Sequence, residues 1–86
     1  MKKETYRFFA YRRIVSLITI KDGMIGMQLS RETGINDSTT PQYLKFLKTE
    51  GLVTAKKEGR CKRIYLTSKG KELKNRFIEI INMLEK

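Results

Sequence analysis

A stop signal and a start signal for α-helices stand within eight residues of each other near the middle of the chain. Gly34 favours the left-handed backbone conformation with which many helices end. The segment 36–41, which reads NDSTTP, follows at once and is dense in residues that cap helix N-termini. Two starts are open: Asn36 caps a helix that begins at the next residue, or Thr40 caps a helix with Pro41 in its first position. In both cases the sequence predicts two helices joined by a short turn.

Helices are predicted on both sides of this turn. Residues 5–20 carry apolar side chains at three- and four-residue steps, which predicts an amphipathic helix. An Asp-Gly turn is expected at residues 21–23 and a short helix over residues 24–33. The helix after the central turn is expected to run to about Glu50, because Gly51 stops it. The apolar face of the first helix is formed by Phe8, Tyr11, Ile14, Val15 and Ile18.

A β-hairpin is predicted next, with strands at residues 52–57 and 62–67. The second strand alternates apolar and polar residues clearly, and the first does so weakly. Residues 58–61 are expected at the hairpin tip. Cys61 would then lie at an exposed tip among basic neighbours, where it is either a reactive thiol or an incidental residue.

The last helix is predicted over about residues 68–85, capped by Thr67 or Ser68. Most of its apolar stripe extends beyond the compact domain that the preceding elements form. We therefore expect this helix to pair with a second copy of the chain, and packing on its own domain is the alternative. The predicted dimerisation residues are Leu73, Phe77, Ile80, Ile81 and Leu84.

The predicted elements make a mainly α fold with a small β-hairpin. A chain of 86 residues forms one domain, so the prediction is a single unit over residues 1–86. Within it, a helix-turn-helix occupies about residues 24–50, a wing about residues 52–67 and a long C-terminal helix about residues 68–85. This order of helices and hairpin is that of a winged helix-turn-helix, whose helix after the turn enters the DNA major groove.

The composition excludes several kinds of active site. The chain has no histidine and one cysteine, so the familiar His/Cys metal sites and every mechanism with a histidine base are ruled out. Glycine-rich nucleotide-binding motifs are also lacking. We expect no enzymatic activity, no metal and no cofactor.

The charge balance indicates a polyanionic partner. The formal net charge is +10, from 19 Lys+Arg against 9 Asp+Glu, which favours nucleic acid first and an acidic membrane surface second. The longest mostly apolar run, residues 14–20, is far short of the roughly 20 residues that cross a bilayer, so no membrane association is expected. One cysteine forms no internal disulfide, which favours a reducing, cytoplasmic location, near the nucleoid or in a host cytoplasm if the source is viral.

Basic residues concentrate in the second half of the chain. Residues 45–76 hold eleven Lys/Arg against three acids, a net charge of +8. Such residues neutralise DNA phosphates and supply affinity without sequence information. The alternative is a solvated basic face that binds nothing specific.

Two blocks of the sequence resemble one family. Residues 34–53, GINDSTTPQYLKFLKTEGLV, resemble the recognition-helix segment of MarR/ArsR-type winged-helix transcriptional regulators, typically Gly-Leu-Ser-x-Ser-Thr-Val-Ser-Arg-x-Leu-x-x-Leu-x-x-x-Gly-Leu-Val. Residues 66–73, LTSKGKEL, resemble the Leu-Thr-x-Lys-Gly-x-x-Leu that follows the wing in the same group. The resemblance covers about residues 24–75. Small archaeal and viral winged-helix repressors have a similar size and layout.

The chain also departs from this family pattern. Pro41 and Gln42 stand where the family often has Ser and Arg, so the base preference does not carry over. The extra helices that give larger MarR-type regulators their ligand pocket are absent, as are the Cys/His pairs of metal-sensing relatives. No small-molecule ligand is therefore expected.

The expected DNA contacts fall into two groups. Short polar or amphipathic side chains near the start of the recognition helix reach base edges, where Gln pairs with adenine and Thr touches a thymine methyl. Capping alone is the alternative for the hydroxyl residues, and a half-buried position is the alternative for the tyrosine. The predicted base-reading residues are Ser38, Thr39, Gln42 and Tyr43. The predicted backbone and wing contacts are Lys45, Lys48, Lys56, Lys57, Arg60, Lys62 and Arg63.

These observations predict a sequence-specific regulator of transcription that binds double-stranded DNA as a homodimer and acts as a repressor. One alternative is an architectural DNA-binding protein with little sequence discrimination. The other is a winged-helix module that binds a protein partner. The operator, the regulated genes, the sign of regulation, the source organism and the orientation of the dimer are left open.

Overall fold

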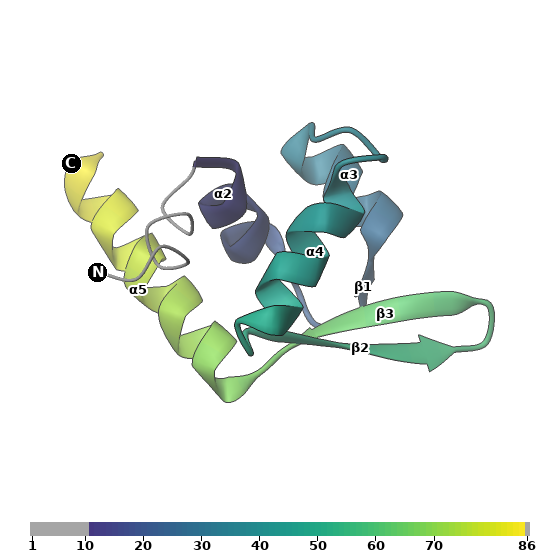
Figure 1. The fold of residues 1–86 in the computed structure, drawn as a ribbon. Coiled ribbons are helices and arrows are strands. Elements are labelled where there is room, and N and C mark those ends of the chain that lie inside the picture. Colours follow the sequence, from purple (N-terminus) through teal and green to yellow (C-terminus); the bar gives the residue numbers. More distant parts are fainter. Residues whose placement is uncertain (1–10, 86) are drawn as a thin grey trace.

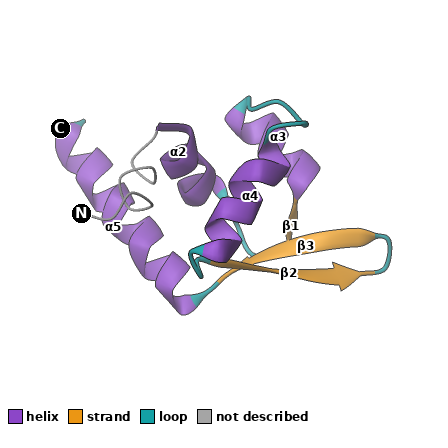
Figure 2. Ribbon diagram, viewed as in Figure 1, coloured by secondary structure: helices purple, strands orange, loops and turns teal. Residues whose placement is uncertain are grey.

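A computed structural model describes residues 11–85 of the chain. Its order of helices and strands confirms the predicted winged helix-turn-helix (Figures 1 and 2). Residues 5–10 of the first predicted helix, with Phe8, lie outside the described residues. The elements are α2 (Tyr11–Thr19), β1 (Met24–Ile25), α3 (Gly26–Thr33), α4 (Thr40–Thr49), β2 (Val53–Glu58), β3 (Cys61–Leu66) and α5 (Ser68–Leu84).

The helices are arranged around α2. It packs against α5 on one side and against α3 and α4 on the other. The β2–β3 hairpin starts beneath α4 and projects away from α5, so that α5 and the wing lie at opposite ends of the molecule (Figure 1). The helix-turn-helix therefore lies between a long terminal helix and a free-standing wing.

The sheet has a third strand that the sequence analysis did not predict. Met24 and Ile25, expected in a helix over residues 24–33, pair instead with β3, which gives the antiparallel order β1-β3-β2. The cause lies in the turn before them: Gly23 has a φ of 87°, and its N–H donates to the Ile64 carbonyl at 2.8 Å. This bond directs the chain along β3, so α3 begins only at Gly26.

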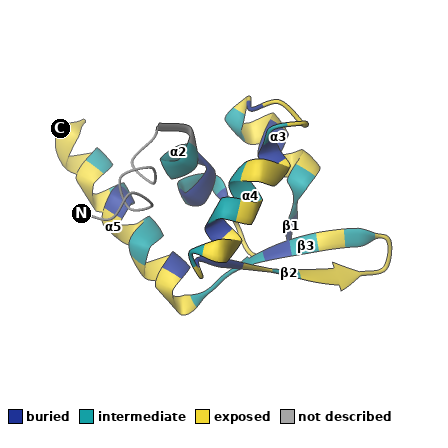
Figure 3. Cartoon of the chain, in the orientation of Figure 1, coloured by how far each residue is buried: buried dark blue, intermediate teal, exposed yellow. Residues whose placement is uncertain are grey.

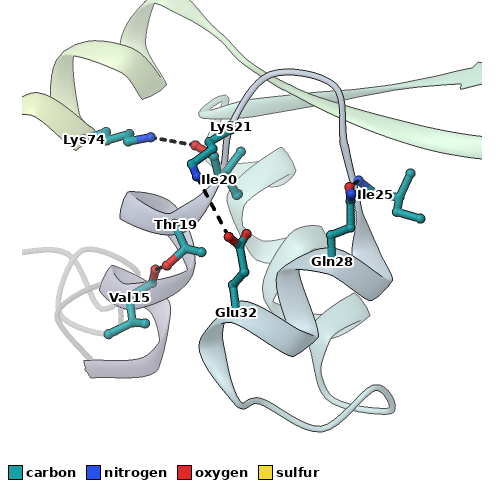
Figure 4. Close-up of polar contacts among 8 residues, drawn as sticks. All are labelled: Val15, Thr19, Ile20, Lys21, Ile25, Gln28, Glu32 and Lys74. Atoms are coloured by element: carbon teal, nitrogen blue, oxygen red, sulfur yellow. Dashed lines mark hydrogen bonds and ion pairs between the residues drawn. The ribbon is translucent and has the colours of Figure 1, made fainter.

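The start of α3 is closed by a side chain of the helix itself. The Gln28 Oε1 accepts a hydrogen bond from the Ile25 N–H at 3.0 Å (Figure 4). At the other end Gly34 adopts a φ of 74° and donates to the Ser30 carbonyl, which confirms the predicted glycine stop. The following Ile35 is buried against the domain.

The core forms where α2, the helix-turn-helix, the base of the sheet and α5 meet. Leu17, Leu29 and Leu47 are completely buried, and Phe77 of α5 is also buried there. The outer half of the hairpin and the end of α5 are mostly exposed (Figure 3). The core therefore fixes the recognition helix and the wing base and leaves the wing tip in solvent.

The apolar face predicted for the first helix is broader in the structure: Ile14 and Ile18 pack against the core, but other residues are more deeply buried. The side chain of Tyr11 lies outside the described residues. Ile14, Val15 and Ile18 are only half-buried, whereas Leu17 and Ile20 are completely buried. Packing from both sides of α2 explains the difference, because a helix covered on two sides buries more than one stripe.

The junction between the hairpin and α5 is closely packed. Thr67 is the cap of α5, since its hydroxyl oxygen accepts from the Gly70 N–H at 3.0 Å. The same hydroxyl donates to the Gly51 carbonyl at 2.7 Å. A Cβ on Gly70 would lie 2.0 Å from the Leu52 carbonyl oxygen, so only glycine allows this approach.

The hairpin is tighter than predicted. Its strands are joined by the two residues Gly59 and Arg60, and Glu58 pairs with Cys61 across the end of the ladder. Gly59 has a φ of 63°, which a two-residue hairpin loop with glycine in its first position requires. Cys61 is therefore a half-buried strand residue rather than an exposed tip residue.

Candidate nucleic-acid interface

The recognition helix α4 begins at Thr40, three residues after one of the two starts that the sequence left open and one residue before the other. Thr39 occupies the N-cap position without a capping side-chain bond, and Pro41 follows within the first turn. The Asn36 carbonyl oxygen, rather than its side chain, accepts from the N–H groups of Thr39 and Thr40, both at 3.0 Å.

A buried pair of hydroxyls explains this start. Ser30 of α3 donates to the Thr40 Oγ1 at 2.7 Å, and Thr40 donates to the Asn36 carbonyl at 3.1 Å. Both side chains are buried, with exposed fractions of 6% for Ser30 and 3% for Thr40. The pair joins the two helices of the motif and the turn between them, and no spacing in the sequence indicated it.

The four predicted base-reading residues lie at the start of α4 and in the turn before it, but they are not equally accessible. Ser38 and Gln42 are exposed, whereas Thr39 and Tyr43 are half-buried. Ser38 and Gln42 therefore have the freer side chains toward an approaching ligand.

The cations of the wing divide between its two faces. Lys57 pairs directly with Lys62 and Ala55 with Ile64, so by strand alternation all four side chains share one face. Ile64 on this face is buried beneath the helices, which makes it the face toward α4. The paired residues Lys56 and Arg63 belong to the outer face, and Arg60 lies in the loop.

Arg63 forms a hydrogen bond within the domain. It is half-buried, and its guanidinium donates to the Gly23 carbonyl at 2.7 Å. This bond braces β3 against the turn before β1. The residue was predicted to be a wing contact to the DNA backbone, and the structure shows that it also has a local partner.

The other basic residues of α4 and the wing are exposed and form no ion pair within residues 11–85. The acid nearest the wing tip, Glu58, accepts a hydrogen bond from the Tyr65 hydroxyl, and this bond raises the pKa of Tyr65. Positive charge therefore remains available on this side of the molecule. The exposed cations are Lys45, Lys48, Lys56, Lys57, Arg60 and Lys62.

Cations from two distant parts of the sequence line the same groove. Lys45 and Lys48 of α4 and Lys62 of β3 border a depression of about 560 Å³ between α4 and the sheet. The structure thus brings the recognition helix and the wing into one basic, concave surface, which we call the α4–wing surface and define by the six exposed cations together with Ser38 and Gln42.

The residues predicted for dimerisation fall into two sets. Phe77 belongs to the core and Leu73 packs against it, so both serve the domain that contains them. Ile80 is 51% exposed and Leu84 is 80% exposed near the end of α5, and Ile81 is half-buried beside them. Met83, which the sequence analysis did not single out, is also exposed there.

The described residues were also searched for metal sites and membrane-spanning helices. Among residues 11–85, the side chains of His, Cys, Asp and Glu do not gather in threes anywhere as a metal site would need. Within the same residues, the helices are too short or too polar to cross a bilayer.

Comparison with protein families identifies a family model that matches about half of the chain. The model of bacterial regulatory proteins of the arsR family matches residues 12–55, which hold α2 apart from its first residue, β1, the helix-turn-helix and the first half of β2. No curated protein matches the whole sequence significantly.

Solved structures resemble the entire fold. AF1382 from Archaeoglobus fulgidus superposes with a TM-score of 0.84 at 21% identity, over 98% of this chain and 99% of that protein. A MarR transcriptional regulator from Methanosarcina mazei Go1 gives 0.79 at 26% identity, over 94% of this chain but 57% of its own length. Sso10a-2, a DNA-binding protein from Sulfolobus solfataricus, gives 0.72 at 26% identity, over 88% of this chain and 82% of that protein.

Proposed function

Because the chain belongs to the ArsR family of bacterial regulatory proteins, we propose that it regulates transcription by binding a specific site on double-stranded DNA. Its fold is the winged helix of DNA-binding transcriptional regulators rather than that of an enzyme. The observation that carries the proposal is the α4–wing surface, where six exposed cations lie along α4 and the wing, and exposed Ser38 and Gln42 lie at the start of the recognition helix. The description of Sso10a-2 as a DNA-binding protein supports the same partner.

In the proposed complex, α4 lies in the major groove. Gln42 and Ser38 are exposed at its N-terminal end, where recognition helices contact base edges. A glutamine bonds adenine in bidentate fashion, which favours an A·T pair opposite Gln42. Thr39 and Tyr43 are half-buried and support the geometry of this contact or reach the bases with part of their side chains.

The wing supplies affinity rather than sequence choice. Lys57 and Lys62 face α4, so they approach the same stretch of duplex as the recognition helix. Lys56 and Arg60 extend the positive field toward the flanking backbone or minor groove. Contacts of this kind make binding steeply dependent on salt.

We extend the proposal to a homodimer that represses by occluding a promoter. The apolar side chains near the end of α5 support it, because Ile80, Met83 and Leu84 expose apolar surface at three- and four-residue spacing. Two copies joined through α5 would present two recognition helices about 34 Å apart, one turn of DNA. Sedimentation equilibrium tests this part: the wild type is expected to dimerise, and a monomeric wild type would contradict it.

The test of specific binding is fluorescence anisotropy with a selected site. Duplexes are selected from a random library on the immobilised protein, and the best sequence is compared with a scrambled duplex at several salt concentrations. A specific regulator is expected to prefer the selected site by about a thousandfold or more. Equal, salt-sensitive binding would instead identify an architectural protein, and failure to bind any duplex would leave a protein-partner module.

Two variants separate the recognition of bases from the binding of the DNA backbone. Gln42→Ala is expected to reduce the preference for the selected site while leaving binding to scrambled DNA nearly unchanged. Lys48→Gln is expected to weaken both complexes and to lower the slope of log K against log salt by about one. If Gln42→Ala weakened both complexes equally, its base-reading role would be refuted.

A further inference from the structure

The groove within the α4–wing surface has an apolar floor. Leu44, Val53, Ala55 and Ile64 line it, together with Met27, whose side chain is 56% exposed. In the complex proposed above, DNA phosphates bind the lysines at the rim of the groove, and the apolar floor contributes nothing to that contact. A depression of about 560 Å³ is within the range of small-molecule sites.

Polar groups in the groove are unevenly distributed. The hydroxyls of Ser30 and Thr40 also line it, but they already bond to each other and to the Asn36 carbonyl. The mouth carries Lys45, Lys48 and Lys62 against one acid, Asp37. The complementary ligand therefore has an apolar body and one anionic end.

The shape of the groove favours an elongated body. Its α4 wall runs from Thr40 to Lys48, which is eight residue steps or about 12 Å along the helix axis. A single aromatic ring would cover only part of this length, whereas an extended alkyl chain follows the whole wall.

We propose that this groove binds the carboxylate of a medium-chain fatty acid, with the alkyl chain along α4 and the carboxylate at the lysines of the mouth. Binding places a negative charge among Lys45, Lys48 and Lys62 and fills the concave part of the α4–wing surface. The ligand therefore competes with DNA, a consequence that rests on the function proposed above. This site lies between the recognition helix and the wing and needs no helices beyond those of the small domain.

The first experiment measures binding without DNA. Decanoate, kept below its micelle concentration, is titrated into the protein labelled with ¹⁵N, and amide shifts are followed by NMR. Saturable shifts are expected along α4, α3 and β2. Decylamine, which has the same chain and the opposite charge, is expected to bind at least about tenfold more weakly. Equal binding of both compounds, or no saturable shift with decanoate, would overturn the proposal.

Variants of the floor locate the site. Ala55→Phe fills the groove with a side chain that suits a strand, and it is expected to abolish decanoate binding. Met27→Gln makes one wall polar and is expected to weaken binding by about fivefold. Met83→Gln, the same change on exposed α5, is the matched control and is expected to bind as the wild type does. If Met83→Gln and Met27→Gln lost affinity equally, the alkyl chain would be binding elsewhere.

Anisotropy with labelled DNA then tests the competition. At a decanoate concentration that releases most of the wild type from DNA, Met27→Gln, which leaves the groove unfilled, is expected to be released markedly less. Release of both proteins to the same extent would refute competition through the groove. If the protein bound no duplex at all, the proposed function would fail, while the NMR titration would still decide the ligand site.

Discussion

Lysines at the start of α5 have partners within the domain, whereas those of α4 and the wing have none among the described residues. At the start of α5, Lys71 lies 3.3 Å from the Asp22 carboxylate, and Lys74 donates to the Ile20 carbonyl at 2.7 Å (Figure 4 shows the latter bond). The lysines of α4 and the wing are exposed and lack ion-pair partners among residues 11–85. The charge of +8 over residues 45–76 therefore combines cations that hold the fold with cations that remain free for a partner.

The difference follows from where the backbone leaves unpaired acceptors. The turn after α2 presents the Ile20 carbonyl and the Asp22 side chain to α5, and long basic side chains satisfy them. Burial beside this turn lowers the pKa of Lys74. On the wing, the backbone N–H and carbonyl groups between the strands bond to each other. The side chains beyond the core are therefore not needed as hydrogen-bond donors to the backbone. A segment's net charge thus overstates the charge available to DNA.

The largest expected effect is on the docking of α5. Gly70→Ala would force a Cβ to within 2.0 Å of the Leu52 carbonyl oxygen, so we expect a loss of about 3 kcal/mol or more in the free energy of unfolding. Gly59→Ala at the wing tip meets no atom within 4 Å and adds only the left-handed backbone cost of about 1–2 kcal/mol. Urea denaturation compares the two variants. Equal losses would contradict the close packing of α5.

The second prediction separates the two groups of lysines directly. The double variant Lys57→Gln/Lys62→Gln is expected to lower the slope of log K against log salt by about two, with affinity for DNA falling roughly tenfold to a hundredfold. Lys71→Gln removes one positive charge from α5 and is expected to leave the slope and the affinity nearly unchanged, whereas each wing lysine is expected to contribute about one to the slope. Anisotropy at several salt concentrations measures both. A similar change of slope in Lys71→Gln would show that the division between the two ends does not matter for binding.

The third prediction concerns the buried hydrogen bond between Ser30 and Thr40 at the start of the recognition helix. Thr40→Val keeps the shape of the side chain but leaves the Ser30 hydroxyl buried without its acceptor, at a cost of about 2 kcal/mol. Adding Ser30→Ala removes the orphaned hydroxyl and is expected to recover most of that loss. Thermal and urea unfolding of the single and double variants form the cycle. Strictly additive losses would mean that the two hydroxyls are not coupled.

The smallest effect is the pH dependence contributed by Asp22. The Leu66 N–H, which donates to the Asp22 carboxylate at 2.8 Å, lowers the pKa of this group, and Lys71 lowers it further. The folded pKa is below the unfolded value, so the stabilisation is present above about pH 4 and is lost as the pH falls through the folded pKa. In Asp22→Asn, the free energy of unfolding is therefore expected to fall slightly less between neutral and acid pH than it does in the wild type. Urea unfolding at each pH measures this difference. An unchanged pH profile would contradict this role.

The sequence by itself determined the order of the helices and the hairpin and the position of the recognition helix. Glycine stops, the capping segment before α4 and the apolar alternation of β3 are local signals, and each acts through backbone preferences that do not depend on distant residues. For the same reason Ser38 and Gln42 could be placed in advance near the accessible start of α4.

Only the tertiary structure decided which residues meet across the chain. The strand at Met24 arises because Gly23 bonds to Ile64, about forty residues away in the sequence. The partners of Arg63 and Lys71, the Ser30–Thr40 pair and the groove between α4 and the wing depend likewise on packing between separate elements. Phe77 shows the limit most clearly: its spacing on the last helix led to the prediction of a dimer surface, with packing on its own domain as the alternative, and the structure places it in the core. Periodicity specifies which side of a helix is apolar, but the neighbour that covers that side is a property of the assembled fold.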